Sequence, residues 1–304
     1  MLPKFTESLS GKLAERWLTT VFAPAFAFWL GGIAAWAKRF GWQPLVSGFN
    51  GLPEDTQLAL LLGAFILVTL SGFLAQRFEL TLLRWLEGYW PLVLRPLHLR
   101  LIAYQAQRLK RAKQQFQNLA QRGIDTLNPI QRQQLIALDW QLMQAPPPQF
   151  LMPTRLGNAL RAAEQRPKIK YGLDAILCWP RLWFLLPQAA QQELETARDA
   201  LNAAVRLWFW GILSIIWGIW TGWAVAIGLM VALFAYYRWI LDAAAIYAAL
   251  LESAFDLYRL ELYKSLRWPL PATPAEELKQ GKKLTAYLWR GSESATWHFA
   301  DSDD

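Results

Sequence analysis

Cysteine and histidine are almost absent from this 304-residue chain, which has only Cys178, His98 and His298. A single cysteine excludes an intrachain disulfide framework and a cluster of thiolate ligands. Two histidines argue against a histidine-based metal site within one chain, so we expect no metal and no cofactor. A glycine-rich phosphate loop, a zinc-binding HExxH helix and a nucleophile elbow are also missing from the sequence. The sequence therefore favours a protein that is not an enzyme, and no catalytic residue is assigned.

The alternation of apolar and polar residues that marks a half-buried strand is missing too, which favours an all-α fold. Apolar and aromatic residues are in excess: 54% of the chain is hydrophobic and 18 residues are tryptophan. Tryptophan is enriched where a membrane meets water. The mean hydropathy is nevertheless only +0.15, which is low for a pure membrane bundle. The sequence therefore predicts a substantial water-exposed part as well.

Three long stretches carry no charge: residues 17–37, 56–76 and 207–237. The first two have 21 residues each, close to the roughly 20 that one spanning helix needs. The third has 31 residues and is too long for one upright helix. We interpret it as two helices with a turn at Thr221-Gly222, and one long tilted helix is the alternative. For the first stretch, a cleavable signal peptide is the alternative.

The distribution of basic residues predicts the orientation, because cytoplasmic loops carry an excess of Lys and Arg. The predicted fold class is an all-α integral membrane protein with four transmembrane helices in two hairpins plus a helical cytoplasmic domain. We expect it in the bacterial inner (plasma) membrane, multi-pass, with both termini cytoplasmic. The predicted segments are an amphipathic cytoplasmic N-terminus (1–16), the first hairpin (17–77), the helical cytoplasmic domain (78–202), the second hairpin (203–240), C-terminal cytoplasmic helices packing on that domain (241–290) and an acidic disordered tail (291–304).

The most distinctive sequence outside the predicted spans covers residues 153–182. Thr154 is expected to cap a helix that Pro167 ends. Polar side chains fall on one face of this helix, with carboxylates nearby to pair with its arginines. They suit a pocket for an anion, a phosphate or a lipid headgroup, or an ion-paired network that fastens the segment. These candidate residues are Arg155, Asn158, Arg161, Glu164, Tyr171, Asp174 and Arg181.

Small residues recur four apart in the predicted spans, a spacing that lets helix backbones approach closely. Helix packing is one interpretation, and a pore lined by small and hydroxylic side chains, such as Ser214 and Thr221, is the other. The residues concerned are Ala27, Gly31, Ala35, Ala59, Gly63, Ser214, Gly218, Thr221 and Gly222.

The leading functional hypothesis is a homo-oligomeric channel or pore-like assembly regulated through its cytoplasmic helical domain. The alternative is a non-conducting membrane scaffold or sensor that recruits a cytoplasmic protein partner. The net charge of +8 is explained by contact with the lipid bilayer and its anionic headgroups, and no motif indicates nucleic acid. In layout alone the chain resembles bacterial bestrophin-type channels, in which four spans meet a helical cytosolic domain. This resemblance implies a channel architecture and carries over no residue.

Overall fold

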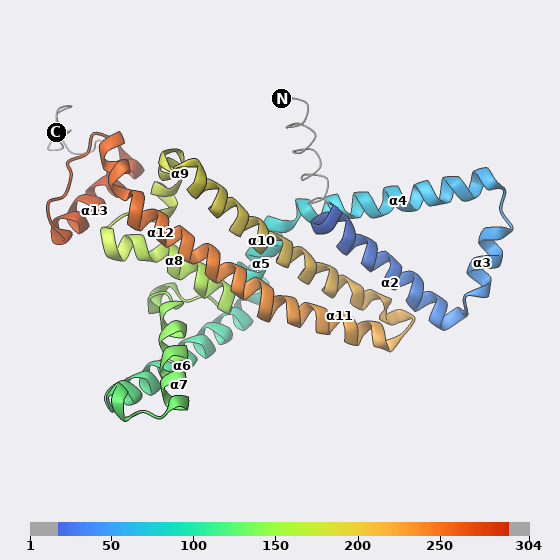
Figure 1. The fold of residues 1–304 in the computed structure, drawn as a ribbon, viewed down its shortest axis with the longest axis horizontal. Helices are drawn as coiled ribbons and strands as arrows, with labels where there is room; N and C mark the ends of the chain where they lie inside the picture. Colours follow the sequence, from blue (N-terminus) through green and yellow to red (C-terminus); the bar gives the residue numbers. More distant parts are fainter. Residues whose placement is uncertain (1–17, 292–304) are drawn as a thin grey trace. The chain divides into compact units, whose positions relative to one another are not determined.

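The computed structural model describes residues 18–291, in which the regular secondary structure is all helical, with no strand (Figure 1). The prediction of an all-α fold is therefore confirmed. The predicted amphipathic N-terminus, the start of the first predicted span at Trp17 and all of the acidic tail after Gly291 lie outside the described residues.

Four helices are long and apolar enough to cross a membrane: Leu18–Phe40, Glu54–Arg77, Gln188–Ile219 and Gly222–Ser265. The first comprises η1 (Leu18–Phe22) and α2 (Ala23–Phe40), and the second is α4 (Glu54–Arg77). The third comprises α10 (Gln188–Leu213) and η5 (Ser214–Ile219). The fourth comprises α11 (Gly222–Phe234), η6 (Ala235–Ile240) and α12 (Leu241–Ser265). The charge-free stretches of the sequence account for all four.

The structure adds three details to the predicted helices. The helical stretches around residue 220 are two, separated at Trp220-Thr221, so the alternative of one long helix is wrong. The predicted loop at 38–55 contains a helix, α3 (Gln43–Asn50). The second charge-free stretch lies in α4, which ends at Arg77, and a separate helix, α5 (Glu79–Glu87), follows.

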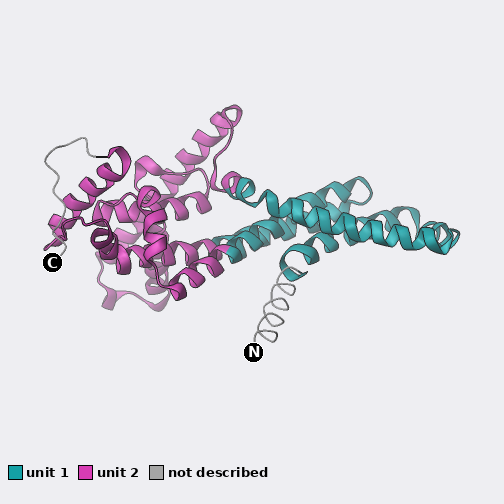
Figure 2. Ribbon diagram, turned by 90° about the horizontal axis from the view of Figure 1, so that it is seen from above, with its two compact units in different colours: residues 1–83, 199–242 teal, residues 84–198, 243–304 magenta. Residues whose placement is uncertain are grey.

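The chain divides into two compact units (Figure 2). Unit 1 comprises Met1–Leu83 and Asp199–Asp242, and unit 2 comprises Arg84–Arg198 and Ala243–Asp304. The division falls within α5, α10 and α12, so each of these helices contributes residues to both units.

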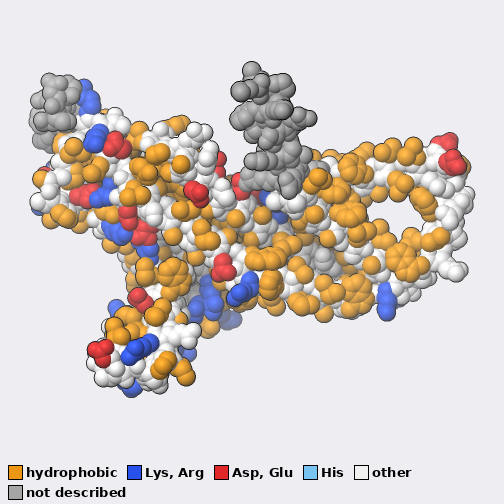
Figure 3. Space-filling view, viewed as in Figure 1, with side chains coloured by type: hydrophobic (Ala, Val, Ile, Leu, Met, Phe, Trp, Pro, Cys, Tyr) orange, Lys and Arg blue, Asp and Glu red, His pale blue; other side chains and the backbone are white. Residues whose placement is uncertain are grey.

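Unit 1 has a small interior. One buried cluster consists of Ala25, Val68, Ala75 and Trp210, and Leu83, Leu201, Val205 and Ile240 are buried elsewhere in the unit. Helices approach one another most closely at glycine: a Cβ atom added to Gly228 would lie 2.7 Å from the Gly211 carbonyl oxygen. The large apolar side chains face outward instead, and they cover much of these helices in Figure 3. On α4 alone the exposed ones include Leu58, Leu61, Leu62, Phe65, Ile66, Leu70 and Leu74.

One buried ion pair lies in unit 1. The Arg206 guanidinium pairs with the Glu79 carboxylate, and both side chains are largely buried. Arg206 also donates a hydrogen bond from Nε to the Thr20 carbonyl oxygen at 3.1 Å. This arginine borders the charge-free stretch 207–237, and a carboxylate within reach compensates its charge inside the unit.

Unit 2 has an extended apolar core to which distant parts of the chain contribute. Its elements include η2 (Leu92–Leu94), α6 (Arg95–Ala120), η3 (Ile124–Thr126), α7 (Pro129–Met143), η4 (Pro148–Phe150), α8 (Arg155–Tyr171), α9 (Ala175–Leu185) and α13 (Pro274–Arg290). The largest fully buried side chains of its core cluster are Tyr263, Phe255, Leu173, Leu182, Leu262 and Leu284. α6 packs on α7, and α13 packs on both α8 and α9.

Helix α8 does not end at Pro167 as predicted. It continues to Tyr171, and Gly172 closes it in the left-handed conformation with φ 74°. Pro167 lacks the amide proton that would bond to the preceding turn. Its ring is fully buried, and we attribute the tolerance of this proline to the apolar burial that offsets the missing hydrogen bond.

Candidate functional site

The N-terminus of α8 is fixed to the end of α5 within unit 2. The Thr154 hydroxyl accepts a hydrogen bond from the Gly157 amide at 2.9 Å and so caps α8 as predicted. The same hydroxyl donates to the Glu87 carbonyl oxygen at 3.0 Å. Gly157 is needed at this contact, because a Cβ atom there would lie 2.1 Å from that oxygen. The side chain of Glu87 is thereby held close to α8.

Two of the predicted α8 residues meet beside Glu87. Arg161 donates to the Glu164 carboxylate at 3.1 Å and to the Tyr89 hydroxyl at 2.6 Å. Glu87 and Glu164 line one cavity of about 190 Å³, with Arg198 and the rings of Trp179 and Tyr247. The guanidinium of Arg198 lies 5.4 Å from the centre of the Tyr247 ring, within the range of a cation–π contact.

Burial raises the pKa of both carboxyl groups in this cavity. Burial, and secondly the negative charge of Glu164, raise the pKa of Glu87 from 4.5 to about 7, against the opposing effect of Arg198, Arg161 and Arg84. Burial also raises the pKa of Glu164, although Arg161 opposes the shift. A carboxyl group with a pKa near neutrality exchanges its proton in the physiological pH range. We call these two residues with their cavity the carboxyl pair.

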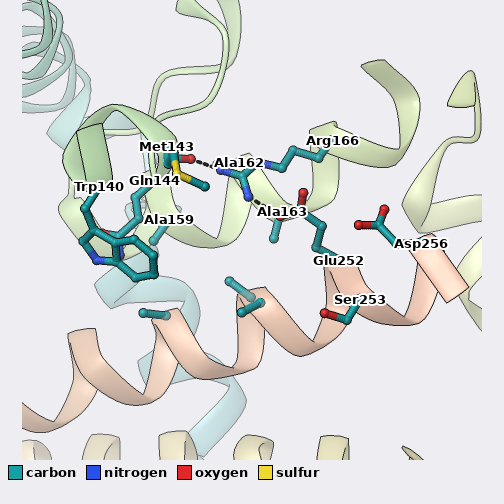
Figure 4. Close-up of a pocket in the computed structure, with 13 residues that line it drawn as sticks. Trp140, Met143, Gln144, Ala159, Ala162, Ala163, Arg166, Glu252, Ser253 and Asp256 are labelled. Carbon is teal, nitrogen blue, oxygen red and sulfur yellow. Dashed lines mark hydrogen bonds and ion pairs between the residues drawn. The ribbon is translucent and has the colours of Figure 1, made fainter. Parts of the chain in front are cut away.

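A second cavity of about 190 Å³ lies between α7, α8 and α12 (Figure 4). Its apolar walls are formed mainly by alanine, and Arg166, Glu252 and Asp256 stand at one end. The Arg166 guanidinium bonds both to Glu252 and to the Met143 carbonyl oxygen. Lys170 pairs with Glu252 at 2.6 Å and with Asp256 at 3.3 Å. The charged groups at this end are therefore paired with one another.

The remaining predicted residues lie away from the carboxyl pair and make other contacts. Asn158 is buried and exchanges two hydrogen bonds with the backbone of Met152, at 2.8 and 3.0 Å. The Tyr171 hydroxyl donates to Asp256 at 2.5 Å. Arg155 lies exposed at the start of α8. Asn158 is thus engaged in fixing the loop before α8, which makes it unsuited to the predicted role of a ligand donor.

Asp174 and Arg181 both serve α9. The Asp174 carboxylate caps α9 by accepting from the Ile176 amide at 3.1 Å, and it pairs with Lys168 at 3.3 Å. The Arg181 guanidinium donates to the Leu177 carbonyl oxygen at 2.7 Å. The seven predicted residues therefore do not form a single pocket.

The sequence analysis missed the acidic partners of α8. Glu252 and Asp256 lie on α12, more than 80 positions along the chain from the cations they pair with. Their spacing of four residues, which places both on one face of a helix, was the available signal. No such spacing marks Glu87, because the environment of its side chain arises from burial in the folded chain.

The predicted small residues of unit 1 differ in how closely other parts of the chain approach them. A Cβ atom added to Gly31, Gly63 or Gly222 would meet nothing within 4 Å, so packing within one chain is not their role. Ala27 and Ala59 are exposed and Ala35 is buried. Besides the predicted Gly218, close approaches lie at glycines that were not predicted, including Gly32, Gly72, Gly211 and Gly228.

The three predicted small residues around the break at Trp220-Thr221 behave differently. The Ser214 hydroxyl donates to the Trp210 carbonyl oxygen at 2.8 Å. Gly218 lies against Val225 of α11, and an added Cβ would stand 2.4 Å from that side chain. The Thr221 hydroxyl is buried and has no hydrogen-bond partner within residues 18–291.

Metal and thiol chemistry find no support in the part of the chain that the structure describes. There, no group of three or more His, Cys, Asp or Glu residues is arranged to hold a metal ion. Cys178 is fully buried, and burial is the main cause that raises the pKa of its thiol to about 12, so it is a packing residue. Comparison of the chain with protein-family models, with curated proteins and with solved structures finds no match.

Proposed function

We propose that this protein is a multi-pass helical membrane protein that forms a homo-oligomeric, pore-like assembly regulated through its helical unit 2. The observation that carries this proposal is the length of two helices, Gln188–Ile219 and Gly222–Ser265. Gly222–Ser265 has 44 residues, which at 1.5 Å per residue extend about 66 Å. The hydrocarbon core of a bilayer is only about 30 Å thick. Such a helix has a spanning half and a half that leaves the membrane.

The same two helices supply core residues of unit 2. α10 contributes the buried Leu194, and α12 contributes Phe255 and Leu262. In this proposal, a movement of unit 2 reaches the spans along these helices, as gating by a domain outside the membrane requires. In this proposal unit 2 lies in the cytoplasm, and the spans form two hairpins joined at α3 and at Trp220-Thr221.

The exposed faces of the spans support insertion in lipid. The side chains that α4 turns outward are Leu, Phe and Ile over more than four turns. In water such a surface would be a strong aggregation site, whereas lipid tails solvate it. The excess of basic residues outside the two short connections supports cytoplasmic termini in a bacterial inner membrane.

The pore lining is proposed for the small residues that find no partner within one chain. Gly31, Gly63 and Gly222 have open space where a side chain would stand, and the Thr221 hydroxyl is unpaired among the described residues. A neighbouring copy or a hydrated axis would account for the open space at these glycines, whereas the Thr221 hydroxyl is buried within the chain beside Gly222.

Two measurements test the proposal. Membrane-impermeant maleimide should label Ser47→Cys from outside intact cells, and Ser265→Cys only after permeabilisation; both positions are exposed.

In planar bilayers, purified oligomer should give discrete openings whose amplitude falls when Thr221→Leu enlarges the lining. Ala226→Leu, on an exposed position of α11, is the matched control. Silence of a well-folded oligomer under salt gradients and tension would overturn the pore.

The alternative is a non-conducting scaffold, and one observation favours it. α9 presents an apolar stripe of Ile176, Pro180 and Phe184, four residues apart, and Phe184 is 84% exposed. Exposed apolar stripes of this kind mark protein-docking sites. If bilayers stay silent, loss of a co-purifying partner in Phe184→Ser would favour the scaffold.

A further inference from the structure

Two aliphatic side chains of unit 2 are almost fully exposed at the turn between α5 and α6. Leu92 and Val93, both in η2, are 84% and 87% exposed. A hydrogen bond of 2.9 Å from the Leu94 amide to the Pro91 carbonyl oxygen closes the turn that carries them. Further large side chains of the same stretch are about half exposed: Trp85, Tyr89, Leu97, Leu99 and Tyr104. Exposed apolar surface of this kind marks a binding site, and we call Leu92 and Val93 the η2 tip.

The stretch that contains the η2 tip and α6 is basic and has no acidic residue. Between Gly88 and Ile124 the chain has seven Lys or Arg and no Asp or Glu. On α8, by contrast, Arg166 and Lys170 pair with carboxylates of the chain. Six of the seven basic residues are exposed and form no ion pair with another residue of the range 18–291: Arg95, Arg100, Lys110, Arg111, Lys113 and Arg122. An anionic partner would supply the missing counter-charges.

An anionic membrane surface matches both features of this stretch. At such a surface aliphatic and aromatic side chains enter the headgroup region, while Lys and Arg bind lipid phosphates. Nucleic acid would match the charge, but its phosphate backbone offers no apolar site for the η2 tip. The combination of an apolar tip and unpaired cations therefore favours lipid.

The chain also holds the η2 tip near lipid. Leu92 lies 15 positions after Arg77, where α4 ends, and α4 has the highest hydropathy of the four membrane-length helices. Nine of the intervening residues are coiled in α5, so this tether spans about 35 Å at most. With α4 in the bilayer, as the proposed function has it, the tip cannot move far from the membrane surface.

We infer that the η2 tip and the basic residues of α6 together form an anchor for anionic phospholipids. Leu92 and Val93 enter the membrane at the level of the headgroups, and the cations of α6 bind the phosphates. This inference rests on the proposed insertion of α4 and adds the surface by which unit 2 binds the membrane.

Fluorescence quenching in reconstituted vesicles tests the anchor. The full chain carries one added cysteine, Leu92→Cys, labelled with an environment-sensitive maleimide dye. Cys178 can stay in place, because it is buried and burial raises the pKa of its thiol. The vesicles contain phosphatidylcholine with or without phosphatidylglycerol, and a lipid with a nitroxide near its headgroup is the quencher. With phosphatidylglycerol, quenching at position 92 should be about twofold or more that at Phe184→Cys on α9, which is equally exposed at 84%.

Removal of charge separates headgroup binding from simple apolar insertion. Arg100→Gln/Arg111→Gln should abolish at least half of the extra quenching that phosphatidylglycerol gives at position 92, because the anionic lipid attracts α6 less. Lys282→Gln/Lys283→Gln removes the same charge from exposed positions of α13 and should leave the quenching unchanged. Equal effects of the two double variants would overturn the role of α6.

A dye at Leu62→Cys, a 54% exposed position on α4, reports insertion of the span itself. Quenching there without quenching at position 92 would overturn the anchor and leave the proposed membrane protein standing. Absence of quenching at both positions would overturn both. Equal quenching at positions 92 and 184 would mean that unit 2 meets lipid without using this surface, and would overturn the anchor. Quenching at position 92 that is independent of phosphatidylglycerol, or a dye that responds to an RNA oligonucleotide instead of lipid, would overturn the binding of anionic headgroups.

Discussion

The two units of this chain are built in opposite senses. Unit 1 buries small residues such as Gly72 and Ala75 of α4 and exposes that helix's leucines and phenylalanines. Unit 2 buries Phe255 and Tyr263 and carries most of the charged groups on its surface, as Figure 3 shows for one face. Burial of large apolar side chains stabilises a fold in water, whereas close backbone packing must do so in lipid. This difference is what our proposal of a unit 1 in lipid and a unit 2 in water requires.

Ion pairs follow the same division. In unit 1 both side chains of the pair of Arg206 and Glu79 are largely buried, whereas in the unit 2 pairs of Arg259 with Glu277 and around Lys170 at least one side chain is more exposed. A buried charge cannot be solvated when its partner is removed, so the cost of losing a partner should be higher in unit 1. The following predictions test this comparison, in order of decreasing effect.

Arg206→Ala should be the most destabilising change. It leaves the Glu79 carboxylate buried and unpaired, at a cost of about 3–5 kcal/mol. Thermal unfolding of the purified protein in detergent measures the effect, and Arg238→Ala, at an exposed position, is the control. Removing both partners in Arg206→Ala/Glu79→Ala should cost less than Arg206→Ala alone. A double variant at least as unstable as the single one would contradict this explanation.

Gly281→Ala should destabilise unit 2. The added Cβ atom would lie 1.9 Å from the Tyr171 carbonyl oxygen, so α13 must move away from α8 at a cost of about 1–3 kcal/mol. Lys283→Ala, an exposed position on the same helix, should have little effect on the unfolding temperature. Equal shifts for the two variants would mean that this contact is looser than the structure indicates.

Glu87→Gln should stabilise the protein at high pH only. The pKa of Glu87 is raised from 4.5 to about 7 in the folded state, so the folded chain binds more protons than the unfolded chain between these values. Stability of the natural protein is therefore lost as pH rises through that window. At pH 8 the variant should gain about 1 kcal/mol after allowance for screening by solvent, and near pH 5 the two should be similar.

Unfolding temperatures at pH 5 and pH 8 measure this gain, and the exposed Glu193→Gln is the control. A gain that is the same at both values of pH would refute the assignment to the carboxyl pair.

Gly63→Ala should have the smallest effect, and it should stabilise the protein. Nothing lies within 4 Å of the added Cβ atom, so the variant gains only the helix preference of alanine over glycine, about 0.5–1 kcal/mol. Gly228→Ala is the matched change on α11 and should destabilise, because its Cβ atom would lie 2.7 Å from the Gly211 carbonyl oxygen. If Gly63→Ala also lowers the unfolding temperature, a neighbouring subunit packs on that glycine.

The sequence by itself determined which segments form the long apolar helices. Charge-free stretches of suitable length predicted the four membrane-length helices, because hydropathy and length are properties of a segment alone. The Thr154 and Asp174 side chains cap helices through amides two or three residues away, so those local roles were also within reach of the sequence.

Only the tertiary structure decided which side chains meet. The carboxyl pair joins Glu87 to α8, and Tyr171 finds Asp256 at a separation of 85 residues. It also decided that Gly32, Gly72, Gly211 and Gly228 are the sites of close approach, whereas Gly31 and Gly63 meet nothing in the chain. A four-residue spacing defines a helix face, but the rotation of that face towards a neighbour depends on the packing of all the helices together. Burial and the raised pKa of Glu87 arise from the same packing, which no local pattern encodes.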